Sequence, residues 1–211
     1  MTKIEIKTNS EQTRTRLLEA ARATFSQLGF QGATVREICR RAEANVAAVN
    51  YHFGSKDGLL SEALNFDPLK DMQLANVDAA KCPAIRLQLF IHEFMSMLLD
   101  EKNASSQCRI MARELADPTP ALDQIVREAI APLHDFLGKL VIEVMDEKIN
   151  KTALHRHVNS IVGQCVFYSH SYPVLQRLHP TLRYNQSEIK AIAEHVAEFS
   201  LSALQKFTKN H

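Results

Sequence analysis

The sequence predicts an all-α protein, and three observations support that prediction. Apolar residues make up 45% of the 211 residues, with only 6 Gly and 7 Pro, which is typical of a globular helical chain with a full core. Apolar residues recur at spacings of three and four in one segment after another. Helix-capping residues precede several of these segments, and no segment shows the alternation typical of a strand. We expect one or two small domains.

The first two predicted helices lie within residues 14–42. The first spans residues 14–28 and should bury one apolar side, formed by Leu17, Ala21, Phe25 and Leu28. The second begins near residue 35, because Thr34 and Glu37 have the spacing of a capping box, in which each side chain bonds the other residue's backbone N–H. Its packing face is formed by Val35, Ile38, Cys39 and Ala42. Other faces carry the cations that can meet phosphate, namely Arg36, Arg40 and Arg41.

A third helix, which is short, is predicted over residues 46–52, with Asn45 as its N-cap. Its packing residues should be Val46, Val49 and Phe53. The residues left pointing outward are Ala47, Ala48, Asn50 and Tyr51. Such a thin, uncharged face fits the major groove of DNA and can approach base edges closely. An ordinary solvated helix would carry Lys and Glu at these positions.

This stretch resembles the helix-turn-helix of the TetR family of bacterial repressors. In that family a short helix ends in an aromatic-rich run and is followed by a Ser-Lys pair and Leu, here Tyr51, His52, Phe53, Ser55, Lys56 and Leu59. The resemblance extends upstream through the first helix and covers roughly the first third of the chain. It implies a three-helix DNA-binding domain over residues 1–54, followed by a helical effector-binding and dimerisation domain over residues 55–211.

One residue departs from the family pattern. The family usually has Gly in the turn between the two short helices, where this chain has Glu43. If that position needs a positive φ, Glu costs about 1 kcal/mol there. Its negative charge near DNA would also weaken nonspecific binding.

Charge and cysteine usage agree with an intracellular DNA-binding protein. Lys plus Arg against Asp plus Glu is 9 to 6 in residues 1–60 and 16 to 18 in the remainder, which gives the net charge of +1. The basic excess thus falls in the region expected to bind phosphate. Four scattered cysteines without a CxxC pair indicate buried free thiols in a reducing cytoplasm: Cys39, Cys82, Cys108 and Cys165. No apolar run is long enough to cross a bilayer, so we expect no membrane contact and a cytoplasmic location.

The rest of the chain reads as a series of helices. Ser55 should cap a helix running to about Phe66. Thr119 should cap a long helix, with Pro120 at its first position, that extends to about Asp146 and bends near Pro132. Four further helices are expected over residues 83–100, 106–115, 152–171 and 187–207.

The last two predicted helices each carry an apolar stripe. In TetR-like proteins the last pair of helices meets its symmetry mate as a four-helix bundle, which implies a homodimer that presents two reading heads to DNA. The residues that the resemblance assigns to this interface are Val158, Ile161, Val162, Cys165, Ile192, Val196, Phe199 and Ala203. From the sequence alone, the same stripes could also be part of an ordinary core.

A narrower resemblance covers ARELADPTPALDQIVREAIAPLHDFL and SIVGQCVFY. These stretches are similar to a TetR subgroup whose members often lie beside genes for efflux pumps, which implies a sensor for a small, partly apolar effector. Candidate pocket residues are polar or methionine side chains on otherwise apolar helices, together with one neighbouring phenylalanine. They are His92, Phe94, Met95, Met111, Arg113, His134, Gln164 and Tyr168. Each of them could instead be structural, as a satisfied core histidine or an Arg113–Glu114 salt bridge.

Catalytic, cofactor and metal sites are not expected. No Ser-His-Asp set or Gly-rich phosphate loop occurs, and His155 and His157 lie on different helical faces. The TetR resemblance implies a homodimeric repressor on a near-palindromic operator of double-stranded DNA, released by its effector. Residues from Asn45 to His52 are expected to enter the major groove, with Ala47, Ala48, Asn50 and Tyr51 as the base readers. The expected phosphate contacts are Thr34, Arg36 and Lys56. Two alternatives are a helical small-molecule carrier with a degenerate DNA domain and a small helical enzyme.

Overall fold

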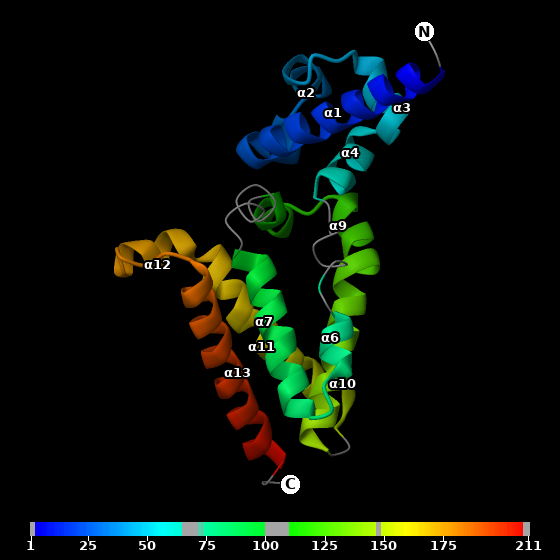
Figure 1. Cartoon of the computed structure of the whole chain (residues 1–211). Coiled ribbons are helices and arrows are strands. Elements are labelled where there is room, and N and C mark those ends of the chain that lie inside the picture. The colour runs from blue at the N-terminus through cyan, green and yellow to red at the C-terminus, as the bar shows by residue number, and fades with distance from the viewer. Residues whose placement is uncertain (1–2, 65–71, 73, 100–109, 147–148, 209–211) are drawn as a thin grey trace. The chain divides into compact units, whose positions relative to one another are not determined.

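The computed structural model describes residues 3–64, 72, 74–99, 110–146 and 149–208, and in these ranges every regular element is helical (Figure 1). The all-α prediction is confirmed. The chain forms two compact units. The first comprises residues 1–66 and 105–127, and the second comprises residues 67–104 and 128–211. The first unit therefore holds more of the chain than the predicted DNA-binding segment 1–54.

Five named helices build the first unit, together with helical residues 110–116. Their bounds are α1 Lys3–Gly32, α2 Val35–Arg41, α3 Val46–Phe53, α4 Lys56–Ala63 and α9 Pro120–Ile125. Helix α1 is interrupted at Gly29, whose φ of 70° and ψ of 178° are not helical. Leu17, Ala21 and Phe25 are buried as predicted, whereas Leu28 is 47% exposed. The spacing along one helix does not report where its neighbours end, so Leu28 was wrongly predicted to be buried.

Side-chain caps begin the short helices where the sequence predicts. The backbone N–H of Glu37 donates to the Thr34 hydroxyl at 3.2 Å, that of Ala47 to the Asn45 side chain at 2.9 Å, and that of Gly58 to Ser55 at 3.0 Å. Only half of the predicted capping box forms. The Glu37 carboxylate accepts hydrogen bonds from arginines on its own helix instead of reaching back to the Thr34 N–H.

Among its described residues, the second unit contains six further α-helices, and a short π-helix that crosses the boundary between the units precedes the third of them in chain order. Their bounds are α6 Leu74–Ala79, α7 Pro83–Leu99, η1 Val126–Ile130, α10 Ala131–Met145, α11 Lys151–His170, α12 Tyr172–Leu178 and α13 Gln186–Thr208. Helices α7, α11 and α13 match the predicted ranges to within one residue at each end. Helices α6 and α12 were not predicted. Part of the predicted helix 106–115, the end of the one predicted to reach Phe66, and Cys108 lie outside the described residues.

The long helix predicted over residues 120–146 is not continuous. The π-helix η1 separates α9 from α10 just before Pro132. Proline has no N–H to donate to the carbonyl four residues earlier, and its ring crowds that carbonyl, so a wider turn relieves the clash. The structure thus has a π-helix just before the position at which the sequence predicted a bend.

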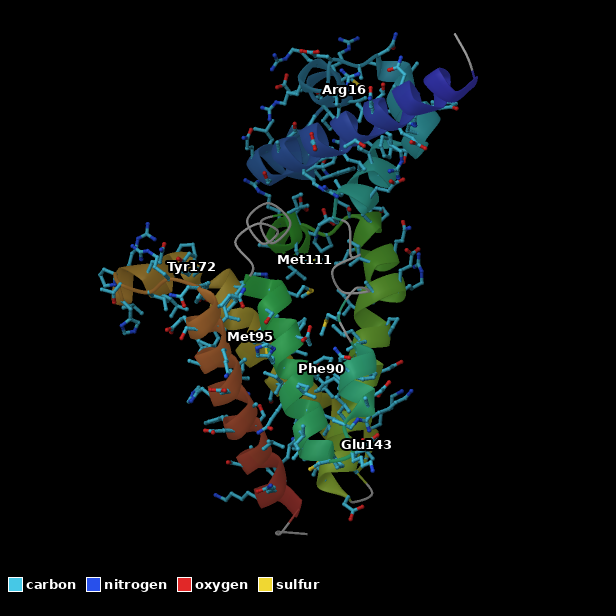
Figure 2. All side chains as sticks on the ribbon, in the orientation of Figure 1. Arg16, Phe90, Met95, Met111, Glu143 and Tyr172 are labelled. Carbon is cyan, nitrogen blue, oxygen red and sulfur yellow. The ribbon has the colours of Figure 1, made fainter. Side chains whose placement is uncertain are left out.

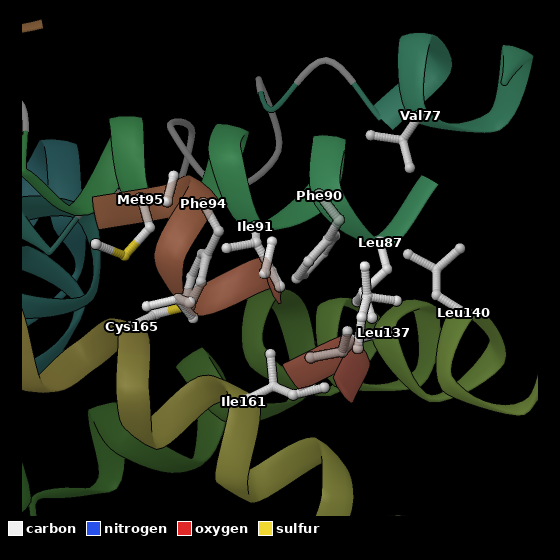
Figure 3. Close-up of a cluster of buried hydrophobic side chains, with 14 of the residues drawn as sticks. Val77, Leu87, Phe90, Ile91, Phe94, Met95, Leu137, Leu140, Ile161 and Cys165 are labelled. Carbon is white, nitrogen blue, oxygen red and sulfur yellow. The ribbon is translucent and has the colours of Figure 1, made fainter. Parts of the chain in front are cut away.

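Helix α7 occupies the centre of the second unit, where it packs against α6, α10, α11 and α13. Figure 3 shows side chains from these helices converging on its buried face. Phe90, Ile91 and Met95 are at most 1% exposed. Phe90 stacks on Phe94 and on Phe136 of α10, with centroid distances of 5.9 Å for both pairs. The wide apolar stripe of α7 is thus explained by neighbours on several sides. Among the described helices, none is both long and apolar enough to span a bilayer.

Candidate nucleic-acid interface

Helix α3 presents an uncharged face to solvent. Tyr51 is 80% exposed, and Asn45, Ala47 and Asn50 are exposed as well. Ala48 and His52 are half-buried, so they reach solvent less freely than predicted. Val46 was predicted to pack inward but is 44% exposed. It is the first residue of a helix of 8 residues, and the core does not extend as far as this first turn. Val46 therefore belongs to the outward face of α3, which the spacing of the apolar residues did not predict for it.

The opposite side of α3 is fixed to the first unit. Val49 is fully buried and Phe53 is 8% exposed. The Arg14 guanidinium of α1 lies 5.4 Å from the centroid of the Phe53 ring, and Arg14 also forms an ion pair with Glu62 of α4. These contacts join α3 to α1 and α4. The short helix is thereby held rigid while its outer face remains free.

The exposed end of α3 is aromatic. The rings of Tyr51 and His52 meet edge to face with centroids 4.8 Å apart, and His52 also contacts the Phe53 ring at 5.9 Å. This chain of rings runs from the exposed Tyr51 to the buried Phe53. A phenol supported in this way keeps its hydroxyl in solvent while its ring loses little freedom on binding.

The turn between α2 and α3 contains a left-handed residue other than glycine. Glu43 has φ 50°. The turn is closed by the N–H of Ala44, which donates to the Cys39 carbonyl at 3.0 Å, and the Glu43 side chain is 86% exposed. Glu43 therefore has the positive φ that was considered for this position, a conformation that glycine adopts at lower cost.

Most cations near α3 already have partners. Arg40 and Arg41 bond to the Glu37 carboxylate. Arg16, which is labelled in Figure 2, lies 3.9 Å from Glu43. Hydrogen bonds from Arg40 and Arg41 hold the pKa of Glu37 down at about 2. Arg36 is exposed, and the described part of the chain provides it with no ion pair.

Two predicted phosphate contacts have structural partners of their own. The Lys56 ammonium donates to the Phe30 carbonyl at 2.5 Å and lies 4.1 Å from the centroid of the Phe30 ring. Burial lowers the pKa of Lys56. Thr34 is exposed, and its hydroxyl accepts from the Glu37 N–H, which leaves its own O–H free to donate. Lys56 therefore also secures the end of α1 against the start of α4.

The segment after residue 109 completes the first unit. The Arg113 guanidinium donates to the Gln27 carbonyl at 2.9 Å, next to the kink at Gly29. The positive φ of 70° at Gly29 favours glycine, and a Cβ there would lie 3.1 Å from the Arg113 guanidinium, which would have to shift by a few tenths of an ångström. Glu114 is buried and accepts from the Thr119 hydroxyl at 2.8 Å. The alternative of an Arg113–Glu114 salt bridge is therefore wrong.

The eight predicted pocket residues are divided between the two units. Met111 and Arg113 belong to the first unit, and the other six belong to the second. Phe94 and Met95 are buried in the core, and His92 is half-buried. The remaining three polar candidates make contacts within the second unit. His134 lies 3.4 Å from Asn159, Gln164 donates to the Ser160 carbonyl at 3.2 Å, and the Tyr168 carbonyl accepts from Tyr184 at 2.7 Å.

Most of the predicted interface residues are buried within a single chain. Val158, Ile161, Cys165, Ile192 and Val196 are at most 7% exposed and belong to the core around α7. Assigning these five to a contact between copies was wrong, because α7 already covers that stripe. Val162 and Ala203 are half-buried. Of the predicted set, Phe199 remains open, with 61% of its surface exposed.

Comparisons with known proteins match both parts of the chain. Residues 17–63 match the family described as bacterial regulatory proteins, tetR family. Residues 83–204 match the C-terminal domain of the HTH-type transcriptional dual regulator CecR. The chain belongs to the TetR family. It is accordingly a DNA-binding transcriptional regulator, with α2 and α3 as the helix-turn-helix of the family.

Individual relatives of this TetR-family chain are also transcriptional regulators. The HTH-type transcriptional dual regulator CecR of Shigella flexneri is 28% identical over 171 residues, which cover 75% of this chain and 76% of the relative. The probable HTH-type transcriptional regulator YttP of Bacillus subtilis is 40% identical over 136 residues, 62% of this chain and 63% of YttP. The fold is similar to that of the transcriptional regulator FadR from Bacillus subtilis in complex with stearoyl-CoA, with a TM-score of 0.67, 15% identity, and coverage of 89% and 97% of the two chains.

Proposed function

We propose that this regulator is a repressor that binds a near-palindromic operator as a homodimer and is released by a small, partly apolar effector. The observation that supports it most is the outward face of α3. Tyr51 is 80% exposed on a helix whose opposite side is fixed by the buried Val49. Uncharged side chains held rigidly in this way can enter a major groove without first breaking any contact within the chain.

Base reading is assigned to the exposed residues of α3. The Asn50 amide can bond bidentately to adenine, and Ala47 and Val46 can pack on thymine methyl groups. Tyr51 can donate or accept through its hydroxyl. The half-buried Ala48 and His52 are expected to support these residues rather than to reach far into the groove. Asn45 contributes by capping the helix, since its side chain bonds to the Ala47 N–H.

Phosphate contacts are assigned to Arg36, Thr34 and Lys56. Arg36 and Thr34 are exposed at the start of α2, where the helix dipole also favours an anion. Lys56 would have to exchange its bond with the Phe30 carbonyl for a phosphate oxygen. We therefore expect Arg36 to contribute more to DNA affinity than Lys56. These contacts set the register of α3 in the groove without reading sequence.

The homodimer is assigned to the outer faces of α11 and α13. Phe167 on α11 is 52% exposed, and Phe199 and Phe207 on α13 are 61% and 49% exposed. A Cβ added at Gly163 would meet nothing within 4 Å, so a second copy could approach this helix closely. Two copies of α3 would then reach major-groove sites one helical turn, about 10 bp, apart.

The effector is assigned to the second unit, and the repressor would act in the cytoplasm. FadR, which has a similar fold, is in complex with stearoyl-CoA, a ligand with a long apolar chain and a charged head. A partly apolar effector of this general kind would suit a helical unit rich in Phe, Leu and Met. Release requires that the effector bind more tightly to the form of the protein that does not fit the operator.

Selection of binding fragments from the source genome, followed by salt titrations, tests the proposal. Asn50→Ala or Tyr51→Ala should relax selection at particular bases, by about 1–3 kcal/mol for each lost contact. Arg36→Ala should instead weaken binding to all duplexes alike and reduce the salt slope by about 1. If wild-type protein selects no sequence, or if the α3 variants select the same sequences with the same affinity, the assigned reading face is wrong.

A further inference from the structure

Two carboxylates near α3 bind three of the arginines that could otherwise meet DNA. Glu37 holds Arg40 and Arg41, both on α2, and Glu43 lies 3.9 Å from Arg16 on α1. These groups lie on or beside the helix-turn-helix. The small basic excess of residues 1–60 is therefore largely engaged within the protein.

In the Glu37 cluster, formed by Glu37, Arg40 and Arg41, the two arginines bind the carboxylate much as arginines bind a phosphate group. The Nε and Nη2 atoms of Arg40 donate to the two carboxylate oxygens at 2.8 Å each. The Nε atom of Arg41 donates to one of those oxygens at 2.7 Å. Two guanidinium groups on one planar anion is an arrangement that arginine also uses with phosphate oxygens. The carboxylate thus occupies donors that a DNA backbone would use.

Binding of DNA gains free energy when protein cations replace the counterions condensed on phosphates. An arginine that already bonds to a carboxylate contributes less to the free energy of DNA binding, because it must give up that carboxylate or divide its hydrogen bonds between the carboxylate and the phosphate. Exposed pairs of this type are weak enough to exchange. A specific operator can still recruit these arginines when α3 fits its bases, whereas an unrelated duplex offers little to offset the exchange.

We propose that Glu37 competes with DNA phosphates for Arg40 and Arg41, and so restrains sequence-independent binding relative to operator binding. This inference rests on the proposed function, since it assumes that α3 reads bases. Glu43 acts on Arg16 in the same way but more weakly, because its side chain is 86% exposed and the pair is 3.9 Å apart. Glu37 is thus a specificity-determining residue that touches no base.

The test is a salt titration of Glu37→Gln, using an unrelated duplex and the selected operator as probes. For the unrelated duplex we expect affinity at low salt to rise about 3- to 10-fold and the salt slope to steepen by about 1 or more. Operator affinity should rise less, so that the ratio of operator to unrelated affinity falls. Unchanged affinity and slope for the unrelated duplex would overturn the proposal.

Two comparisons separate competition from a general change of charge. Glu19 is exposed on α1, and the structure gives it no ion pair in the described part of the chain. Glu19→Gln removes the same charge from the same unit and should raise the unrelated affinity less than 2-fold. In an Arg40→Gln/Arg41→Gln background, Glu37→Gln should have almost no effect. A full effect in that background would refute competition for these arginines.

Glu37→Asp provides a second variant that keeps the net charge and the acidic start of α2. Its shorter side chain cannot hold both arginines as Glu37 does, so we expect a smaller gain in unrelated affinity, about 2-fold. Thermal melts verify that each variant is folded. Wild-type protein that shows no salt-sensitive duplex binding would remove the proposed function itself. Wild-type binding with Glu37 variants identical to it would remove only this inference.

Discussion

Glu43 stores backbone strain in the turn of the helix-turn-helix. Its φ of 50° is a left-handed value that costs a side-chain-bearing residue about 1 kcal/mol relative to glycine. We therefore expect Glu43→Gly to raise the free energy of unfolding by about 1 kcal/mol over Glu43→Gln. The Gln variant is the control, because both substitutions remove the ion pair with Arg16. Equal denaturation midpoints for the two variants would mean that the turn is not strained.

Cysteine reactivity should follow burial residue by residue. Cys82 is exposed, contrary to the prediction of a buried thiol, whereas Cys39 and Cys165 are buried. Burial raises the pKa of Cys165 to about 12 and also raises that of Cys39. Since the thiolate is the reactive form, a maleimide at pH 8 should label Cys82 first and Cys165 only after unfolding. Peptide mass spectrometry gives the order, and early labelling of Cys165 would contradict its placement.

Glu37 also has a pH signature. Hydrogen bonds from Arg40 and Arg41 lower its pKa to about 2, so the folded state favours the ionised form. Such a group contributes stability that is fully present above the unfolded pKa of 4.5 and is lost as the pH falls toward 2. The Glu37 cluster should therefore be intact from pH 5 to 8. A carboxyl titration by NMR checks this, and a Glu37 midpoint near 4.5 would show that the cluster does not persist in solution.

At the scale of the element, α3 separates stability from recognition. Asn45 caps α3 through the Ala47 N–H, so Asn45→Ala should lower the free energy of unfolding by about 1 kcal/mol. Asn50 is exposed in the middle of the same helix, so Asn50→Ala should change stability by less than about 0.5 kcal/mol. Urea denaturation measures both. If Asn50→Ala destabilises as much as Asn45→Ala, its amide has a structural role and is not free to read bases.

The sequence predicted well the starts of those helices that begin with a capping residue. Thr34, Asn45, Ser55 and Thr119 each cap a helix through their own side chain, and a cap depends only on residues a few positions away. The π-turn before Pro132 was predicted only as a bend, since proline dictates a disruption but not the form it takes. Helices α6 and α12 have 6 and 7 residues, too short for a periodic pattern to stand out.

The candidate site was predictable where it depends on one helix and not where it depends on neighbours. The outward residues Asn50 and Tyr51 follow from the spacing of Val49 and Phe53 alone. The stripe of α11 that includes Val158 was assigned to the interface with an ordinary core as the alternative, because an apolar stripe shows that a helix is covered but does not show what covers it. The Glu37 cluster was missed for a related reason. Its 3- and 4-residue spacings to Arg40 and Arg41 were visible, but the capping box was a competing partner for the same carboxylate.

At the scale of the whole molecule, the proposed regulation depends on two copies acting together. The exposed Phe199 on α13 should lie between them, so Phe199→Glu should shift the protein from dimer to monomer and weaken operator binding at least 10-fold. Ile85→Glu is the matched control, because Ile85 is 48% exposed on α7 and lies outside the proposed interface. Sedimentation velocity at micromolar concentration reports the change. A wild-type monomer, or a Phe199→Glu dimer as stable as wild type, would contradict the assigned interface.

Footprinting on a selected operator examines the role of α3 most directly. With wild-type protein we expect two protected half-sites, related by a two-fold axis and centred about 10 bp apart or a multiple of that spacing, with protection in the major groove. An Asn50→Ala/Tyr51→Ala double variant should retain its fold and dimer but lose the footprint. A single protected patch without symmetry, or a footprint that persists in the double variant, would show that α3 does not read the operator.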